Sequence, residues 1–275
     1  MKSQSRSMLR GVMTIAAGIA FAASGCGMQD EGEGVGETQG PVIAGTLSNP
    51  AAHPYENLFV KVTIGNSYCT GTLLGNATAG SSSWVLTAKH CAGATTDPAT
   101  VFAIRGAEKV GALNIYPNPD GQDATLIELV SSMTTANSVY FTTLTPTQLV
   151  GTAVRCFGYG NSAWTDKNGD GTFTKSEFSG GGKLRLGDFT VKADASDTTS
   201  FYDLVVPNPQ GQALAPGDSG GPCIKGADVN STGAINLTGI LKAGTNQNTT
   251  GIVTYNREVA STVISSWIRQ YVPRP

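Results

Sequence analysis

Residues 217–222, with the sequence Gly-Asp-Ser-Gly-Gly-Pro, limit most strongly how this chain can fold. Three glycines and a proline within six residues favour a tight turn, because glycine adopts backbone angles that other residues avoid and proline fixes its own. In such a turn the Ser219 hydroxyl can point outward, beside backbone N–H groups that bind an anion. An ordinary surface turn has the same composition, so Ser219 becomes a candidate nucleophile only if the chain also supplies a base.

The chain has only two histidines, so the choice of a base is narrow. His90 ends an apolar, strand-like run, whereas His53 lies in a proline-containing loop typical of a surface histidine. A base of this kind needs a carboxylate to orient it. Asp123 begins a second apolar run, while Asp120 is better explained as a turn former. The predicted order along the chain is therefore His90, Asp123, Ser219.

The composition favours an all-β protein that is large enough to bury a sizeable core. Only 14% of the 275 residues are charged and 35 are glycine, which is typical of many short strands joined by turns. The formal net charge of −2 gives no electrostatic reason for a polyanionic partner. We therefore expect no nucleic-acid partner.

Six segments in this order resemble the trypsin/chymotrypsin family of serine endopeptidases. They are residues 69–74, 86–91, the strand that begins at Asp123, and residues 158–160, 217–222 and 251–268. Together they span nearly the whole chain from Val42 onward. The chain departs from the family at Lys89, where a small residue is usual, and at Thr125, where alanine is usual. Neither departure removes a catalytic group.

The resemblance implies two six-stranded antiparallel Greek-key β-barrels followed by a C-terminal helix. The peptidase domain would cover residues 42–275, with the N-terminal barrel over about 42–145 and the C-terminal barrel over about 146–275. A helix is also predicted by the apolar spacing within residues 258–272. The apolar positions are Val259, Val263, Ile264, Trp267 and Ile268.

The implied activity is hydrolysis of protein or peptide substrates through an acyl-enzyme. Ser219 would attack, His90 would transfer the proton, Asp123 would orient His90, and the backbone N–H groups of Gly217 and Ser219 would hold the oxyanion. Two alternatives stay open: a latent or non-catalytic protein that uses this fold for binding or adhesion, and an esterase with the same triad. We expect a monomer.

The family's specificity pocket maps onto Ala213 at its base and onto Gly244 and Gly251 at its walls. The base carries no carboxylate, which argues against a preference for Arg or Lys, and two glycines leave room for a large apolar side chain. Lys242 and Ala243 stand where the family usually carries Ser and an aromatic residue. Lys242 is also suited to an acidic substrate group.

Four of the five cysteines are paired by the resemblance. Cys69 and Cys91 match the family's bridge beside the histidine. Cys156 and Cys223 are shifted by two residues each, in opposite directions, from another family bridge, which keeps them opposite in an antiparallel pair. Cys26 is left over.

The first 41 residues resemble an export signal and a tether. Residues 1–25 combine basic residues with a short apolar run, as in a secretory signal peptide. The run ends in Ala-Ser-Gly before Cys26, which resembles a bacterial lipoprotein processing site with Cys26 as the lipid anchor; ordinary cleavage near residues 20–22 is the alternative. Residues 26–41 are Gly/Glu-rich, as in a tether or propeptide. We expect an outer-membrane or cell-surface lipoprotein, or a secreted protein.

The segment Pro41-Val42-Ile43 resembles the family's activation junction. The resemblance implies that an unknown activating protease frees the Val42 amine, which then enters the protein and pairs with Asp218. A buried ammonium and a buried carboxylate must be paired, so this cleavage would act as a switch from zymogen to enzyme.

Residues 166–177 match the twelve-residue calcium loop of an EF-hand at each diagnostic position. The expected ligands are Asp166, Asn168, Asp170, the Thr172 carbonyl, Thr174 through water, and Glu177. The flanking residues indicate loops, not the paired helices of an EF-hand. We expect an inserted loop that binds a structural Ca²⁺ ion; an acidic turn without metal is the alternative.

Overall fold

The computed structural model describes residues 45–51, 53–75, 80–135, 137–165, 178–194, 198–206, 208–225, 234–246 and 254–272. All of them belong to one compact unit, residues 38–275. The signal-like residues 1–25, the segment 26–41 and the calcium loop 166–177 lie outside the described residues. So do Cys26, Val42 and Gly251.

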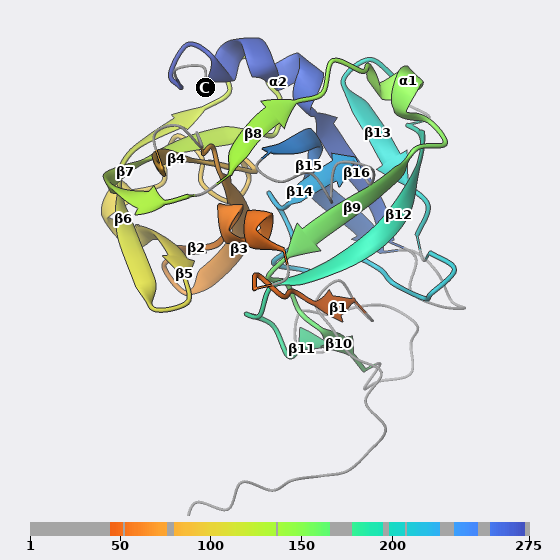
Figure 1. Cartoon of the computed structure of the whole chain (residues 1–275), viewed down its shortest axis with the longest axis horizontal. Coiled ribbons are helices and arrows are strands. Elements are labelled where there is room, and N and C mark those ends of the chain that lie inside the picture. Colours follow the sequence, from red (N-terminus) through yellow and green to blue (C-terminus); the bar gives the residue numbers. More distant parts are fainter. Residues whose placement is uncertain are drawn as a thin grey trace, which may run out of the picture. The chain divides into compact units, whose positions relative to one another are not determined.

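The first half of the described chain forms a closed antiparallel β-barrel (Figure 1, orange to yellow-green). Its strands pair in the order β2-β3-β4-β7-β6-β5. They are β2 (Phe59–Ile64), β3 (Ser67–Leu73), β4 (Ser81–Thr87), β5 (Val101–Arg105), β6 (Glu108–Pro117) and β7 (Thr125–Thr134). Aliphatic side chains such as Val62, Leu86 and Leu126 are fully buried inside it, which stabilises the closed sheet by removing apolar surface from water.

The second half, together with the short strand β1 near the start of the described chain, forms an eight-stranded sheet. Its strands are β1 (Thr46–Leu47), β8 (Ser138–Phe141), β9 (Ala153–Gly158), β12 (Arg185–Ala193), β13 (Phe201–Leu204), β14 (Pro222–Lys225), β15 (Ala234–Asn246) and β16 (Thr254–Ala260). The pairings β9-β12-β13-β16-β15-β14 close into a ring, because β14 also pairs with β9. The strand β1 adds to β12, and β8 pairs in parallel with β15. This architecture confirms the expected fold class.

Helices are short and few among the described residues. They are the 3₁₀ helices η1 (Pro54–Leu58) and η2 (Pro98–Thr100) and the α-helices α1 (Pro146–Leu149) and α2 (Ser261–Ile268). None of the helices in the described part of the chain is long and apolar enough to cross a membrane.

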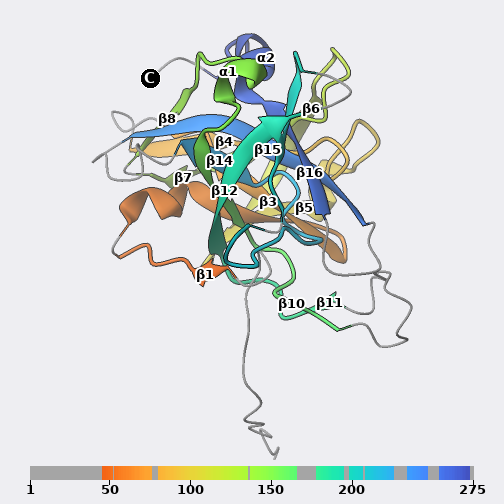
Figure 2. The same ribbon diagram turned by 90° about the vertical axis from the view of Figure 1, so that its right-hand side faces the viewer.

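The apolar spacing within residues 258–272 predicts a helix, and the structure forms one over Ser261–Ile268 only. Residues 258–260 belong to β16, where Glu258 pairs with Tyr202 of β13 and with Leu241 of β15. Two ladders of backbone hydrogen bonds hold this segment extended, so α2 begins only at Ser261. The helix lies against β8 and β15 (Figures 1 and 2) and buries Ile264, Trp267 and Ile268.

Aromatic side chains join the barrel to the second sheet. The rings of Phe59 in β2 and Phe157 in β9 are fully buried, with centroids 4.5 Å apart. The Tyr159 hydroxyl donates a 3.2 Å hydrogen bond to the Phe59 carbonyl. Strand β3 also contacts β9 and β14. These contacts fix the position of the loops that leave the two sheets, and the candidate site is built from those loops.

Candidate active site

Asp123 holds His90 through two hydrogen bonds. The His90 backbone N–H donates to Oδ1 at 2.8 Å, and the ring Nδ1 lies 2.7 Å from Oδ2. These residues meet because β4 and β7 pair antiparallel, with Thr87 opposite Thr125, so the residues that follow β4 lie beside those that precede β7. The His90 side chain is 45% exposed and that of Asp123 only 12%. The imidazole is thus accessible while its orienting carboxylate is shielded.

The environment of Asp123 favours its ionised form. Burial by itself raises the pKa of this carboxyl, but the hydrogen bonds from His90 and the positive charges of His90 and Lys242 lower the pKa below its ordinary value. Asp123 is therefore a carboxylate at neutral pH. That state lets it accept the Nδ1–H proton of His90 and fix the tautomer in which the other ring nitrogen is a base.

Ser219 lies on a turn that packs directly on the strand end leading to His90. Gly217 and Gly220 have φ angles of +99° and +78°, which favour glycine. A Cβ added to Gly220 would lie 2.2 Å from Thr87 Oγ1 and 2.6 Å from Ala88 N, so only glycine allows this approach. Glycine is thus required at position 220, because the Ser219 turn lies so close to the segment that leads to His90.

Thr70 and the Cys69–Cys91 disulfide connect the Ser219 turn to the histidine. The Thr70 N–H donates a 2.9 Å hydrogen bond to the Ser219 carbonyl, and the Thr70 hydroxyl donates to the Gly217 carbonyl at 2.8 Å. Cys91 Sγ lies 3.9 Å from the Ser219 carbonyl oxygen. A His90 ring nitrogen lies within 4.8 Å of both sulfurs. Because the two sulfurs are bonded to each other, this cluster is a structural bridge and not a metal site.

Among the described contacts, the backbone N–H groups of Gly217 and Ser219 have no acceptor. Other N–H groups of the turn are used: Asp218 donates to Ala215 at 3.0 Å, and Gly220 donates to Leu241 at 2.7 Å. Within the described part of the chain, no acceptor is hydrogen-bonded to the N–H of Gly217 or of Ser219. Two open donors at alternating positions of a turn suit an anionic oxygen.

The Ser219 hydroxyl and the His90 ring are not hydrogen-bonded to each other among the described contacts. Catalytic hydrogen bonds of this kind are often long before substrate binds.

Asp218 lies beneath the turn and is almost completely buried, with 1% of its surface exposed. Its Oδ1 accepts a 2.9 Å hydrogen bond from the Gly160 N–H, and its Oδ2 accepts a 2.8 Å hydrogen bond from the Ala215 N–H. Burial, and to a lesser extent the negative charge of Asp218, raise the pKa of Tyr68. Asp218 therefore ties the turn to the loop after β9 and to Ala215.

The family model named Trypsin matches residues 42–268 of the chain. The chain belongs to the trypsin family. Solved structures of trypsin-like proteases share the fold. Mouse neuropsin, a serine protease, is 18% identical with a TM-score of 0.60, covering 82% of this chain and 97% of its own. The Vibrio cholerae VesB protease is 19% identical with a TM-score of 0.57, covering 82% of this chain and 66% of its own.

A third solved structure shows the limit of what this fold implies. The scabies mite inactivated protease paralogue S-D1 is 18% identical with a TM-score of 0.59, covering 83% of this chain and 96% of its own. Because the fold also occurs in a protein described as inactivated, activity in this trypsin-family chain must be argued from its site.

The disulfides of this trypsin-family chain are those that the resemblance implied. The structure contains Cys69–Cys91 and Cys156–Cys223. Cys156 and Cys223 face each other in the β9–β14 ladder, and both are fully buried. The two-residue shifts therefore cancel as expected.

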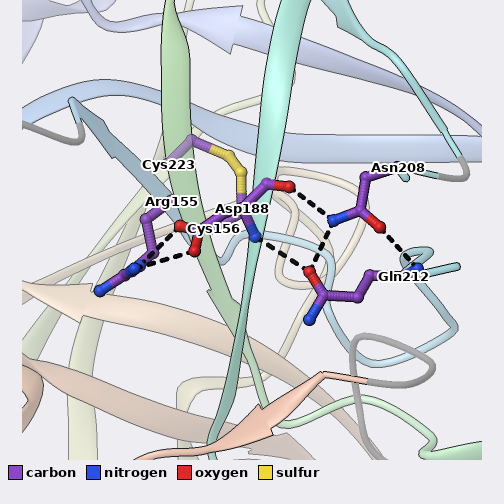
Figure 3. Close-up of polar contacts among 6 residues, drawn as sticks. All are labelled: Arg155, Cys156, Asp188, Asn208, Gln212 and Cys223. Atoms are coloured by element: carbon purple, nitrogen blue, oxygen red, sulfur yellow. Dashed lines mark hydrogen bonds and ion pairs between the residues drawn. A yellow bond between two sulfur atoms is a disulfide. The ribbon is translucent and has the colours of Figure 1, made fainter. Parts of the chain in front are cut away.

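The pocket residues are only partly described. Ala213 is fully buried and follows a loop that is tied to β12 by polar contacts (Figure 3). Asn208 Nδ2 donates to the Asp188 carbonyl and to Gln212 Oε1, each at 2.6 Å, and the Asp188 N–H donates to Gln212 Oε1 at 3.1 Å. Gly244 lies in β15 opposite Asn256. A pocket formed by these residues stays a prediction.

Sequence reasoning missed two features of the site. Thr70 links both halves through its backbone and hydroxyl, and its only signal in the sequence is its place beside Cys69. The electrostatic effect of Lys242 on Asp123 could not be found either, since the two residues lie 119 positions apart in the sequence (242 minus 123).

Proposed function

We propose that this chain is an exported serine endopeptidase that hydrolyses peptide bonds through an acyl-enzyme. The observation that carries the proposal is the accessible His90 beside the Ser219 turn, which Asp123 holds by its ring Nδ1 and by its backbone N–H. The open N–H groups of Gly217 and Ser219 support it, because they offer donors where a tetrahedral intermediate would place its oxygen. The two disulfides fit export to an oxidising compartment.

In the proposed reaction, Ser219 Oγ forms a bond to the peptide carbonyl carbon while its proton passes to His90. Asp123 supports the imidazolium that results. The oxyanion is held by the N–H groups of Gly217 and Ser219. The C–N bond then breaks as His90 returns the proton to the leaving amine, which leaves an acyl-enzyme. Water, deprotonated by His90, attacks the ester carbon, and the acid product leaves as Ser219 regains its proton.

The proposal includes activation by cleavage before Val42, a residue outside the described part of the chain. A freed amine would need a buried anionic partner, and Asp218 is a nearly buried carboxylate next to the nucleophile. Its contacts to Gly160 and Ala215 place it so that a new ion pair would act directly on the Ser219 turn. An export signal in residues 1–25 and a lipid on Cys26 belong to the same proposal.

Fluorophosphonate labelling of the purified exported chain tests the function, with the site mapped by mass spectrometry and the mature N-terminus read in the same digest. The matched controls are Ser219→Ala and Ser83→Ala, the latter in β4. We expect labelling confined to Ser219 in chains that begin at Val42, abolished by Ser219→Ala and kept by Ser83→Ala. Unlabelled chains that do begin at Val42 would refute the catalytic proposal and favour a binding protein.

Two substrate panels extend the same experiment. Turnover of peptides but not of lipid esters is expected for an endopeptidase, and the reverse would identify an esterase. A peptide library would then test the expected preference for a large apolar side chain, which rests on Ala213, Gly244 and Gly251.

The proposal also includes a structural Ca²⁺ ion at residues 166–177. The donor set of the predicted loop consists of oxygens at alternate positions, which is the chemistry that Ca²⁺ requires. The strands β10 (Ala163–Trp164) and β11 (Phe178–Ser179) bracket the segment, with Trp164 paired to Phe178. This short antiparallel pair differs from the helices of an EF-hand and pairs the residues that flank the predicted loop.

Calcium titration of the thermal midpoint tests this part of the proposal. We expect added Ca²⁺ to raise the midpoint and chelation to lower it, since a ligand that binds only the folded chain stabilises it by mass action. Glu177→Gln should remove the response, whereas Asp120→Asn, in an exposed turn, should keep it. An unchanged midpoint in the wild-type chain would mean an acidic turn without metal.

A further inference from the structure

The direction of the Gly217 N–H is set by a contact from outside its own turn. This N–H belongs to the peptide group that joins Pro216 to Gly217. A trans peptide group is planar and directs its N–H opposite to its carbonyl, so a hydrogen bond to the carbonyl fixes where the N–H points. The Pro216 carbonyl accepts a 2.9 Å hydrogen bond from the Asn161 N–H. Asn161 lies in the loop that follows β9, and it therefore orients a donor that belongs to the Ser219 turn.

The second proposed oxyanion donor, the Ser219 N–H, is oriented without help from another loop. It belongs to the peptide group that joins Asp218 to Ser219. The carbonyl of this group accepts a 2.8 Å hydrogen bond from the Gly221 N–H, which lies in the same turn. The two donors are thus supported differently, and only the pair as a whole depends on the loop after β9.

Tyr68 of β3 contacts both the residue that carries the first donor and the residue that orients it. Its hydroxyl donates a 3.1 Å hydrogen bond to Asn161 Oδ1. Its ring lies against the backbone of Gly217, where an added Cβ would be 2.6 Å from Tyr68 Cε2. One side chain of the N-terminal barrel therefore braces the contact between Asn161 and the peptide group of Gly217.

The surroundings of Tyr68 restrict its hydroxyl to this position. A Cβ added to Gly181 would lie 1.9 Å from the Tyr68 hydroxyl oxygen and 2.9 Å from Asn161 Oδ1, so the Gly181 backbone packs directly on the hydrogen bond between them. The Gly217 backbone is similarly enclosed, because its added Cβ would also lie 2.8 Å from Gly160 Cα. Burial raises the pKa of Tyr68, which keeps the hydroxyl protonated and able to donate.

We propose that Tyr68 is a positioning residue that acts through Asn161 to hold the Pro216–Gly217 peptide group with its N–H directed at the oxyanion. The inference rests on the proposed peptidase function, since the role of Gly217 as a donor belongs to it. The oxyanion forms only after Ser219 has attacked, so a misdirected N–H weakens binding of the transition state more than binding of the substrate. The loss is therefore expected in kcat and not in KM.

Steady-state kinetics of the mature enzyme tests the inference with Tyr68→Phe, Asn161→Ala and the double variant. Tyr68→Phe keeps the ring and removes the hydroxyl, whereas Asn161→Ala removes the acceptor and keeps the backbone N–H. We expect each to lower kcat by about 3- to 10-fold with KM little changed. The double variant should lose no more than either single variant, because all three lack the same hydrogen bond. Effects that multiply in the double variant would overturn the inference, and so would a raised KM at unchanged kcat, which would assign Tyr68 to substrate binding.

Tyr116→Phe is the matched control. The Tyr116 hydroxyl, in β6, also donates a hydrogen bond to a side-chain oxygen, Glu128 Oε2, at 3.0 Å. This variant should keep the wild-type kcat and KM. An equal fall of kcat in Tyr68→Phe and Tyr116→Phe would indicate a general loosening of the fold and would count against a positioning role, as would a wild-type kcat in Tyr68→Phe.

Amide hydrogen exchange, resolved by NMR, tests the contact without turnover. In Tyr68→Phe we expect the Asn161 N–H to exchange about 3- to 10-fold faster than in the wild type, while the Gly221 N–H keeps its wild-type rate. Faster Asn161 exchange in a chain that fluorophosphonate does not label would support the link from Tyr68 to the peptide group and refute only the peptidase function. Equal Asn161 exchange in the two chains would overturn the inference even in a chain that is labelled at Ser219.

Discussion

The Gly160 N–H donates a 2.9 Å hydrogen bond to Oδ1 of the buried Asp218, and the backbone at Gly158 approaches the same oxygen so closely that no side chain fits there. A Cβ added to Gly158 would lie 1.9 Å from Asp218 Oδ1. The loop after β9 and the Ser219 turn are therefore built around one carboxylate. This contact explains why Gly158 and Gly160 flank Tyr159 in the sequence.

Gly158→Ala should consequently disturb the Ser219 turn. The added methyl group must displace a carboxylate that holds the turn from below, so we expect a loss of about 1 to 3 kcal/mol in unfolding free energy and a fall in Ser219 labelling. Gly111→Ala is the control, because its nearest contact would be an ordinary 3.6 Å to the Phe102 ring. Urea unfolding of both variants checks the prediction, and equal midpoints would contradict it.

The two disulfides should have different effects when removed as Cys→Ala pairs. The Cys156–Cys223 bridge closes a separation of 67 residues, and loop-closure entropy assigns it about 4 kcal/mol; Cys69–Cys91 closes only 22, for about 3 kcal/mol. The shorter bridge, however, touches the Ser219 carbonyl oxygen and lies beside His90. We expect removal of Cys69–Cys91 to reduce Ser219 labelling more strongly, relative to the stability that is lost, than removal of Cys156–Cys223. Thermal unfolding and fluorophosphonate labelling of the same samples measure the two effects.

The polar network in Figure 3 contains one residue that should matter for stability and one ion pair that should not. Asn208 is buried; it donates to Asp188 and Gln212 and accepts from the N–H groups of Gln210 and Gln212. Asn208→Ala leaves these groups unsatisfied, so we expect a loss of about 2 kcal/mol or more. The two-pronged Arg155–Asp188 ion pair is solvent-exposed at Asp188, and Asp188→Asn should cost less than about 1 kcal/mol.

Chemical denaturation of both variants separates these expectations, and a larger loss in Asp188→Asn would contradict them. The proposed function adds a kinetic consequence. Because the Asn208 loop leads to Ala213, Asn208→Ala should raise KM for the preferred substrates more than it lowers kcat.

Sequence reasoning predicted the parts of this molecule in which short motifs carry the chemistry. The fold class, the pairing of four cysteines and the closeness of His90 to Asp123 follow from segments whose order and spacing are distinctive. The sequence does not predict features that depend on pairing between strands that are far apart along the chain. The start of α2 is set by the two ladders that extend β16, and these depend on residues that lie far away in the sequence.

The electrostatic setting of Asp123 shows the same limit. The positive charge of Lys242 lowers the pKa of Asp123, although Lys242 lies at a register shift in β15 that no local sequence pattern marks. Likewise, the parallel pairing of β8 with β15 joins segments about a hundred residues apart. Such features arise from the packing of whole sheets.

Tyr159 should make the stability of the fold sensitive to alkaline pH. Burial raises its pKa from 10.0 to about 12, although the charge of Arg105 lowers it slightly. The stabilising contribution is complete below the unfolded pKa and is lost as pH rises from about 10 through about 12, because the unfolded chain then releases the proton more readily. The Tyr159→Phe variant lacks this titration but also lacks the hydrogen bond to the Phe59 carbonyl.

We therefore expect Tyr159→Phe to be less stable than the wild type by about 1 kcal/mol at pH 8, and this difference to shrink or reverse toward pH 12. Tyr140→Phe, at an exposed position in β8, should differ little from the wild type at any pH. Denaturant midpoints of the three chains between pH 8 and pH 12 provide the measurement. A difference between wild type and Tyr159→Phe that stays constant across this range would show that the Tyr159 hydroxyl ionises as easily in the folded chain as in the unfolded one.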